Sequence, residues 1–359
     1  MKRALRLAEM GERTAPNPRV GCVIVKGGEI VGEGYHKEYG GRHAEVLAIE
    51  MAGGQAEGAD MYVTLEPCCH LDKQTPPCAG KIIGAGIKRV YAAMEDPNPK
   101  VNGKGIAQLK ENGIEAEAGI MEKEARKLNE PYAKWITTGM PFVVLKLAMS
   151  LDGKIATGSG ESRWISNESS RRLVHEMRKV AGAIMLGVNT VIMDNPSLSA
   201  EGASPLRVIA GNPERIPSNS KILDTARQKT LIACVSVEGK TRKMLEGRGA
   251  EVLELRGKNG RVDLRLLLKR LGERKISSVL AEGGGEIAWS LLKEKLADRV
   301  AFFVAPKIFG GKETAAVAGE GIKRLEECIR IKNAKVKNLG GDFLFEGEID
   351  YPHINVREV

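Results

Sequence analysis

Short apolar segments alternate with helical patterns along most of the chain, and this alternation constrains the fold more than any other sequence feature. Strands and helices that alternate in this way are typical of layered α/β proteins. In the first part of the chain we expect strands at residues 20–25, 30–34, 61–65 and 89–93, and helices at 44–51, 79–85, 106–111 and 122–137. The sequence therefore predicts an α/β fold.

The pattern restarts with an apolar strand just after residue 140, so we expect two domains, residues 1–140 and 141–359. A chain of 359 residues is long enough for two domains that each bury a core. In the second part we expect parallel strands at 142–149, 183–187, 207–210, 230–236, 278–281 and 299–304, with helices at 168–180, 264–271 and 286–296.

Apolar runs and cysteines indicate the compartment. No run of eighteen apolar residues is present, so we expect no membrane partner. The N-terminus lacks a secretory pattern, which predicts a cytoplasmic protein without disulfides. Of the six cysteines, Cys22, Cys234 and Cys328 are interpreted as buried apolar side chains.

The net charge of +9 lies entirely in the second part. Residues 1–140 hold 19 basic and 19 acidic side chains, whereas residues 141–359 hold 36 and 27. Aromatic residues make up only 4% of the chain, which is too few for a base-stacking surface. We therefore expect no nucleic-acid partner and favour local sites for small anionic ligands.

His43, Cys68 and Cys78 form the strongest chemical pattern. One imidazole and two thiolates are three ligands that suit zinc and leave a fourth position open, as a catalytic site requires. Glu45 lies two residues after the histidine and is expected to move a proton between the attacking water and a leaving amine. The pattern resembles the zinc-dependent nucleobase and nucleotide deaminases. The alternative is a structural zinc site completed by Cys69 or His70.

A glycine-rich turn is the main feature of the second part. Gly283, Gly284 and Gly285 lie between a predicted strand and a helix, where bare backbone N–H groups can approach a phosphate. The alternative is that the glycines serve packing alone.

Four charged residues of the second part could either belong to a functional site or have an ordinary structural role. Lys146 and Asp152 flank Ser150 at a strand end, Arg178 lies on a helix, and Asp194 precedes Asn195-Pro196 in a predicted turn. In the ordinary case Lys146 and Arg178 would be solvated surface charges, and the side chain of Asp194 would only form the turn.

Nine residues separate Cys68 from Cys78, and this spacing resembles the bifunctional riboflavin-biosynthesis deaminase–reductases. Further motifs carry the resemblance along nearly the whole chain. They are Pro16-Asn17-Pro18-Arg19, Gly34-Tyr35-His36, Asp96-Pro97-Asn98-Pro99, Gly103-Lys104-Gly105, Leu128-Asn129, the segment Lys146–Gly153, Gly160-Glu161-Ser162-Arg163-Trp164 and Thr190–Asp194.

This resemblance implies a cytidine-deaminase-like three-layer domain followed by a dihydrofolate-reductase-like α/β domain. It implies zinc-dependent deamination of a diaminopyrimidinone ribosyl phosphate, then NADPH-dependent reduction of the ribosyl group to ribityl. Asn17 and His36 would hold the pyrimidine, and Lys146 and Asp194 would join Glu45 as catalytic residues. NADPH would contact Ala148, Trp164, Thr190, Asp194, Gly284, Gly285, Glu286 and Ile287. The substrate of the reductase would face Lys146, Ser162, Arg178, Leu198 and Glu282.

Two positions depart from the family pattern. The loop around Lys73 is one residue longer than is usual there, which weakens the expectation that Lys73 contacts the substrate. Glu201 occupies the position of a common family arginine, so another cation would have to bind the phosphate. The candidates are Arg171, Arg172 and Arg207.

Three rival functions remain open from the sequence. They are a nucleic-acid deaminase with a binding module, a zinc-stabilised scaffold that senses a nucleotide, and a deaminase fused to a pterin or folate reductase. The expected partner is a small-molecule substrate, and the sequence leaves a homo-oligomer open.

Overall fold

A computed structural model describes residues 1–70, 76–258, 260–312 and 314–352. The chain divides into two compact units, Met1–Met140 and Pro141–Val359. Both contain a β-sheet with helices packed against it, and the predicted α/β class is confirmed. Lys73 lies outside the described residues.

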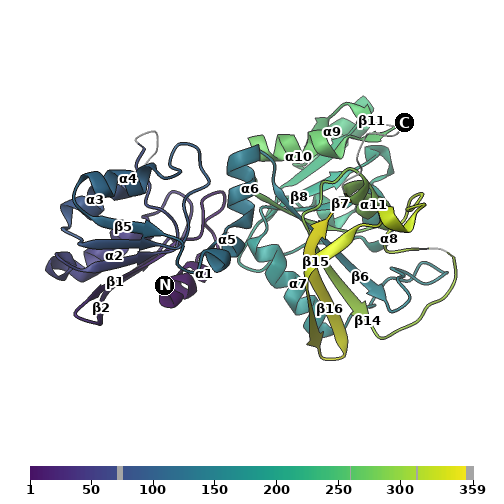
Figure 1. Cartoon of the computed structure of the whole chain (residues 1–359). Helices are drawn as coiled ribbons and strands as arrows, with labels where there is room; N and C mark the ends of the chain where they lie inside the picture. The colour runs from purple at the N-terminus through teal and green to yellow at the C-terminus, as the bar shows by residue number, and fades with distance from the viewer. Residues whose placement is uncertain (71–75, 259, 313, 353–359) are drawn as a thin grey trace, which may run out of the picture. The chain divides into compact units, whose positions relative to one another are not determined.

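Unit 1 has a five-stranded sheet in the order β2-β1-β3-β4-β5 (Figure 1). β1 (Gly21–Lys26) and β2 (Glu29–Tyr35) form a hairpin, β3 (Asp60–Val63) runs antiparallel to β1, and β4 (Arg89–Ala92) and β5 (Glu115–Ala118) continue parallel to β3. The hairpin turns at Gly27 and Gly28, which both have positive φ.

Helices cover both faces of this sheet and make three layers. Successive residues of β1 face opposite sides. Val23 packs with Ala4 and Leu7 of α1 (Lys2–Glu9), while Cys22 and Ile24 belong to the main core. That core also contains apolar residues of α2 (Ala44–Ala52), α3 (Cys78–Gly84) and α4 (Lys104–Glu111).

The expected helix at 122–137 is wrong as a single element. The structure has α5 (Glu122–Leu128) and α6 (Glu130–Thr138), separated at Asn129. Asn129 leaves the helical conformation with φ −111° and ψ 18°, and Pro131 follows it within the first turn of α6. The helical periodicity runs through the break, so periodicity alone could not detect it.

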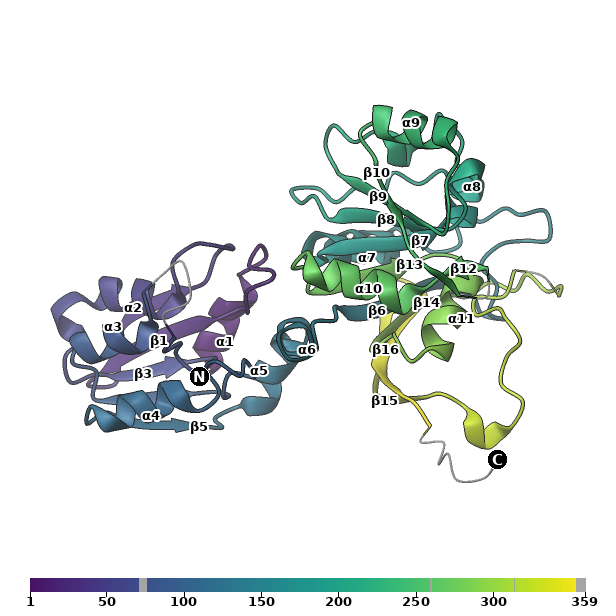
Figure 2. The same ribbon diagram turned by 90° about the horizontal axis from the view of Figure 1, so that it is seen from above.

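Unit 2 has a nine-stranded sheet in the order β10-β9-β8-β7-β13-β6-β14-β16-β15, and Figure 2 shows the strands in this order. The strands are β6 (Phe142–Ser150), β7 (Ala183–Gly187), β8 (Leu206–Ala210), β9 (Thr230–Cys234), β10 (Glu251–Glu254), β13 (Ser278–Glu282), β14 (Arg299–Ala305), β15 (Arg330–Leu339) and β16 (Asp342–Asp350). A separate two-stranded ribbon joins β11 (Gly257–Lys258) to β12 (Arg261–Val262).

Five α-helices of the described part of unit 2 connect these strands. They are α7 (Glu168–Val180), α8 (Val188–Asp194), α9 (Gly239–Gly247), α10 (Leu264–Glu273) and α11 (Gly285–Lys293). Val174 of α7 packs on Ala301, Phe303 and Leu344, so α7 covers one face of the sheet beside β14 and β16.

The six strands predicted for unit 2 are parallel to one another, as expected. The sequence did not predict β15 and β16; β16 pairs antiparallel with β14 and with β15, and Figure 1 shows this pair as a long ribbon. Two expectations for unit 2 are corrected. Asp194 is the last residue of α8 rather than part of an open turn, and Asn195 in the left-handed region ends that helix. Cys328 is partly exposed after a short 3₁₀ turn, unlike the buried Cys22 and Cys234.

Candidate active sites

His43, Cys68 and Cys78 meet in unit 1, with their ligand atoms all within 4.8 Å of one another. The Nδ1 of His43 lies 3.1 Å from the Sγ of Cys78 and 3.6 Å from the Sγ of Cys68. His43 immediately precedes α2, Cys78 begins α3, and Cys68 follows β3. One ring nitrogen and two sulfur atoms at these separations fit a zinc ion.

Glu45 lies in the first turn of α2 beside these ligands and is only 3% exposed. Its Oε2 is buried without a hydrogen-bond partner among the described residues. Burial raises the pKa of this carboxyl, and the neighbouring Cys68 adds to the effect. A buried carboxyl with a raised pKa and an unused oxygen is suited to exchanging a proton with a bound molecule.

Asn17 and His36 form a pair next to this cluster. The Nδ2 of Asn17 lies 3.1 Å from the Nε2 of His36, and the Nδ1 of His36 lies 3.0 Å from the carbonyl of Arg42. With Nδ1 donating to that carbonyl, Nε2 accepts from Asn17, which requires the neutral imidazole. Burial lowers the pKa of His36 and favours the same form. The His36 and His43 rings lie 5.5 Å apart, so the predicted pair borders the metal ligands.

Glu66 holds the loop that carries Cys68, and the sequence analysis did not single it out. Its carboxylate is 2% exposed and accepts hydrogen bonds from the backbone N–H groups of Asp96 at 3.0 Å, Gly103 at 2.9 Å and Ile106 at 3.1 Å. A Cβ on Gly105 would lie 2.1 Å from the carbonyl of Pro67. The loop before Cys68 is therefore packed directly against the start of α4. A charged residue inside the apolar segment 61–67 was the signal available in the sequence.

In unit 2, Lys146, Arg178 and Glu282 form a buried charged cluster. Arg178 binds both carboxylate oxygens of Glu282 at 2.6 and 2.7 Å, and the Nζ of Lys146 lies 3.7 Å from Oε2. Burial alone would raise the pKa of Glu282, but the two cations lower it. Burial lowers the pKa of Lys146. Three residues predicted to face one substrate thus lie together, from β6, α7 and β13.

The residues expected at NADPH gather at the carboxyl ends of neighbouring strands. Thr190 follows β7 and accepts a hydrogen bond at 3.1 Å from the backbone N–H of Gly284, which follows β13. Ala148 lies near the end of β6, the next strand of the sheet. β7 and β6 flank β13 and are joined by α7, so the chain changes direction here, and ligands of α/β sheets bind at such points. The location fits a dinucleotide.

Asp194 and Ser162 are also brought together, with the hydroxyl of Ser162 donating to Oδ1 of Asp194 at 2.5 Å. The ring of Trp164 is 64% exposed, with the Arg171 guanidinium 4.7 Å from its centroid. Leu198 has φ 55° and a side chain that is only 3% exposed and belongs to the core of unit 2. The carbonyl of Leu198 accepts a hydrogen bond from the Nε2 of Gln228 at 3.3 Å, so Leu198 is buried as a whole residue and could face a ligand only after rearrangement.

The glycine turn has a packing role that the sequence left open. A Cβ on Gly285 would lie 2.4 Å from the carbonyl of Ala315, whereas one on Gly284 would meet only the Thr190 hydroxyl at 3.6 Å. Glu286 forms an ion pair with Arg261 at 2.6 Å, and Ile287 packs near Gly187. Close packing therefore explains why residue 285 is a glycine, but it does not explain why residue 284 is one.

Asp152 has a structural role. It accepts a hydrogen bond from Ser150 at 2.6 Å and from the backbone N–H groups of Phe309 and Gly310 at 3.1 and 2.8 Å. These bonds, led by that of Ser150, lower its pKa to about 2.

The three candidate phosphate cations differ in their surroundings. Arg207 is 3% exposed and donates to the carbonyls of Ser197, Lys221, Asp224 and Gln228. Arg172 pairs with Glu168 on the exposed face of α7. Arg171 lies over Trp164 and donates to the carbonyl of Ser166 at 2.6 Å.

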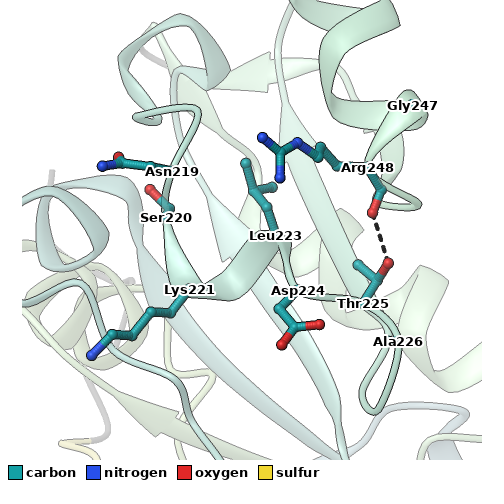
Figure 3. A pocket seen from close by; sticks show the side chains of 9 residues that line it. All are labelled: Asn219, Ser220, Lys221, Leu223, Asp224, Thr225, Ala226, Gly247 and Arg248. Atoms are coloured by element: carbon teal, nitrogen blue, oxygen red, sulfur yellow. Dashed lines mark hydrogen bonds between the residues drawn. The ribbon is translucent and has the colours of Figure 1, made fainter.

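Unit 2 also contains a shallow cavity of about 470 Å³ next to the segment whose carbonyls bind Arg207 (Figure 3). Ser220, Lys221, Asp224 and Arg248 line it, and the hydroxyl of Thr225 donates to the carbonyl of Arg248 at 2.7 Å. None of the predicted site residues lines this cavity.

Among the helices that the structure describes, none is long and apolar enough to cross a membrane.

Comparison with known proteins gives matches over both units. Residues 1–94 match the cytidine and deoxycytidylate deaminase zinc-binding region, and residues 141–345 match the RibD C-terminal domain. The chain is 44% identical to the riboflavin biosynthesis protein RibD of Aquifex aeolicus, covering 96% of each chain. It is 37% identical to that of Escherichia coli, covering 95% of this chain and 96% of the relative.

Solved structures also resemble the whole chain. Acinetobacter baumannii RibD is 38% identical, with a TM-score of 0.87 and 97% of each chain covered. A Thermotoga maritima diaminohydroxyphosphoribosylaminopyrimidine deaminase/5-amino-6-(5-phosphoribosylamino)uracil reductase is 35% identical, with a TM-score of 0.82 over 98% of this chain and 97% of that one.

Proposed function

Because the chain belongs to the RibD family of riboflavin biosynthesis, we propose how its residues divide the two activities of that family. The chain is a bifunctional deaminase and reductase, with zinc and NADPH as cofactors. We assign the deaminase to residues 1–140 and the reductase to residues 141–359. The observation that carries the assignment is the His43, Cys68 and Cys78 cluster beside the unpartnered Oε2 of Glu45.

In the deaminase, His43, Cys68 and Cys78 would hold the zinc, which activates water for attack on the ring carbon that bears the amino group. Glu45 passes one proton of the attacking water to the ring nitrogen and then carries the proton of the new hydroxyl to the amino group, so that ammonia leaves and a ring carbonyl remains. Asn17 and His36 bind the pyrimidine and keep this carbon near the Glu45 carboxylate. Burial raises the pKa of Glu45, so its carboxylate is a stronger base than that of a solvated glutamate and accepts the proton more readily.

In the reductase, Ala148, Trp164, Thr190, Asp194 and Gly284–Ile287 would hold NADPH, which supplies the hydride that reduces the ribosyl carbon. Lys146, Ser162, Arg178 and Glu282 bind the substrate, whereas the buried Leu198 would have to move to face it. The lowered pKa of Lys146 makes its ammonium a better proton donor to the ring oxygen that is released when the sugar opens. Asp194 orients Ser162 through their hydrogen bond.

Arg171 is the cation that we assign to the substrate phosphate in place of the family arginine at position 201. Arg207 is excluded because its guanidinium is occupied by backbone carbonyls, and Arg172 is paired with Glu168. Arg171 is the remaining candidate and borders Trp164, a residue of the same proposed site.

We also propose that two copies of the chain associate through the outer face of the β15–β16 ribbon. Val336 and Phe345 are paired across the ribbon and are 56% and 42% exposed, with Ile331 and Phe343 exposed on the same face. An apolar face of this kind at a sheet edge is typical of an interface. Phe345→Glu is expected to convert a dimer to a monomer in light scattering, and a wild-type monomer would refute the proposal.

The cytoplasm is the compartment that we propose. No disulfide joins any of the six cysteines, all of which lie in the described residues, and Cys68 and Cys78 must stay reduced to act as ligands. A fractionation that found the native protein in an oxidising compartment would contradict this.

The test of the proposed function is to incubate zinc-loaded protein with the diaminopyrimidinone ribosyl phosphate, with and without NADPH. We expect ammonia without NADPH and the ribityl product only with it. Absence of ammonia would refute the deaminase, and NADPH oxidation with a pterin or folate but not with the aminouracil ribosyl phosphate would favour the rival reductase.

A further inference from the structure

Asn129 binds the backbone of a residue that lies 110 positions earlier in the chain. Its Oδ1 accepts a hydrogen bond from the N–H of Arg19 at 2.8 Å, and its Nδ2 donates to the carbonyl of Arg19 at 3.0 Å. The side chain is 2% exposed, so water does not compete for these bonds. One amide therefore satisfies both polar backbone groups of Arg19.

The segment around Arg19 has few other ways to be held. Pro16 and Pro18 flank Asn17 and carry no backbone N–H. The N–H of Asn17 donates to the carbonyl of Thr14 at 2.8 Å within the same turn, which does not attach the turn to the sheet. The backbone of Arg19 is thus the first position after Asn17 at which the rest of the unit can hydrogen-bond to this segment.

Both members of the Asn17–His36 pair depend on this point. Asn17 lies two residues before Arg19, and the carbonyl of Val20, one residue after it, accepts the N–H of His36 at 2.9 Å. The two side chains then meet at 3.1 Å beside the metal ligands. Because the Arg42 carbonyl also holds the His36 ring, a shift of Arg19 would move Asn17 relative to His36.

The Asn129 side chain has no local task that would explain its burial. It lies between α5 and α6 but makes no capping hydrogen bond to either helix with its side chain. Its own backbone N–H closes the end of α5 by donating to Ala125 and Arg126. The amide is therefore used entirely on Arg19.

We propose that Asn129 is a positioning residue for the deaminase, which holds Asn17 in register with His36 through the Arg19 backbone. This inference rests on the proposed function, in which Asn17 binds the pyrimidine. Asn129 itself does not touch the pyrimidine.

A double-mutant cycle on full-length, zinc-loaded protein tests this with Asn17→Ala, Asn129→Ala and the double variant. We expect Asn129→Ala to raise the KM for deamination about tenfold with a smaller change in kcat. In the Asn17→Ala background the same substitution should change kcat/KM less than twofold, because its effect passes through Asn17. Fully additive losses would overturn the proposal, since a general structural defect acts independently of Asn17.

Three controls separate positioning from loss of the fold. Zinc content and the reductase activity of the same molecule should be unchanged in Asn129→Ala. Asn112→Ala, which removes an exposed amide bonded within its own helix end, should leave deamination unchanged. If Asn129→Ala does not fold, Asn129→Asp serves instead, because it keeps the acceptor for the Arg19 N–H and replaces only the donor.

A crystal structure of the variant gives a readout that does not depend on activity. The Asn17 Nδ2 to His36 Nε2 distance should increase beyond hydrogen-bonding range, and an unchanged distance would refute the proposal. If wild-type protein released no ammonia, the proposed function would fail instead, and this distance would still report on Asn129.

Discussion

Arg178 and Glu282 form a bidentate ion pair in unit 2, with N–O distances of 2.6 and 2.7 Å. Their side chains are 15% and 8% exposed. The pair joins α7 to the end of β13. Because Lys146 adds a second cation to the one carboxylate, the cluster keeps a net positive charge where the proposed anionic substrate would bind.

Arg178→Ala is expected to abolish NADPH-dependent reduction and to spare ammonia release. Removing one partner leaves Glu282 buried with only Lys146 at 3.7 Å, which costs about 3 kcal/mol of stability in unit 2. Arg172→Ala on the exposed face of α7 is the matched control and should cost about 0.5 kcal/mol or less. Chemical denaturation and NADPH consumption measure both effects. Equal effects of the two variants would contradict the role of the buried pair.

Glu45→Gln should retain zinc and NADPH binding but lower the rate of ammonia release by about 10²–10⁴-fold, the usual contribution of a general acid–base group. Glutamine has nearly the same shape but cannot carry the proton. Metal analysis and an ammonia assay on one preparation test this. Loss of zinc from the variant would instead make Glu45 a ligand.

The carboxyl of Asp96 should titrate far above an ordinary aspartate. Burial raises its pKa from 3.8 to about 6, against an opposing hydrogen bond from the hydroxyl of Tyr132 at 2.9 Å. Tyr132→Phe should raise the pKa further, because that bond favours the ionised form. Carbon NMR of labelled aspartate measures both values, and a wild-type pKa near 4 would contradict the expectation.

The same shift predicts how stability depends on pH. Since the folded pKa lies above the unfolded one, protonation favours the folded state, and the contribution is complete below pH 4 and lost as pH rises through 6. The change is about 3 kcal/mol for the values given. Asp96→Asn should flatten the stability of unit 1 between pH 4 and 7 by about this amount. An unaltered pH profile in the variant would argue against it.

Gly284→Ala and Gly285→Ala separate ligand binding from packing in the glycine turn. Gly284 has φ −58° and room for a methyl group, so alanine should leave the melting temperature unchanged and weaken NADPH binding. Gly285→Ala places a Cβ 2.4 Å from the Ala315 carbonyl and should destabilise unit 2 by about 1–3 kcal/mol. NADPH titration and calorimetry distinguish these outcomes. Unchanged NADPH affinity in Gly284→Ala would favour packing alone.

Arg171→Ala should raise the KM of the reductase at least tenfold if Arg171 binds the substrate phosphate, because a charge-assisted hydrogen bond contributes about 1.5–3 kcal/mol. A dephosphorylated substrate should show no such difference between wild type and variant. An equal effect on both substrates would mean that Arg171 acts through Trp164 rather than on the phosphate.

Residue types and their order along the chain were sufficient to predict the α/β class. They also led to the prediction that His43, Cys68 and Cys78 hold zinc beside Glu45, because few residue types bind zinc, and the structure brings the three ligand atoms together. The helices that begin at or beside His43 and Cys78 follow from local periodicity. The break at Asn129 has a local signal in Pro131, although the helical periodicity runs through it. The β15–β16 ribbon was beyond such reasoning, because β15 is exposed along nearly its whole length and so has no buried face to impose a hydrophobic period.

The sequence by itself determined which chemical groups this chain carries and in what order, since these follow from composition and spacing. Tertiary structure alone decided which of those groups are accessible to a ligand and which are taken up by packing or internal hydrogen bonds. Arg171 and Arg207 look equivalent in the sequence, yet Arg207 is buried among carbonyls while Arg171 lies over Trp164. Gly284 and Gly285 likewise differ only in what a methyl group would meet. The physical reason is that burial and hydrogen bonding depend on residues distant in sequence, whose positions exist only in the folded chain.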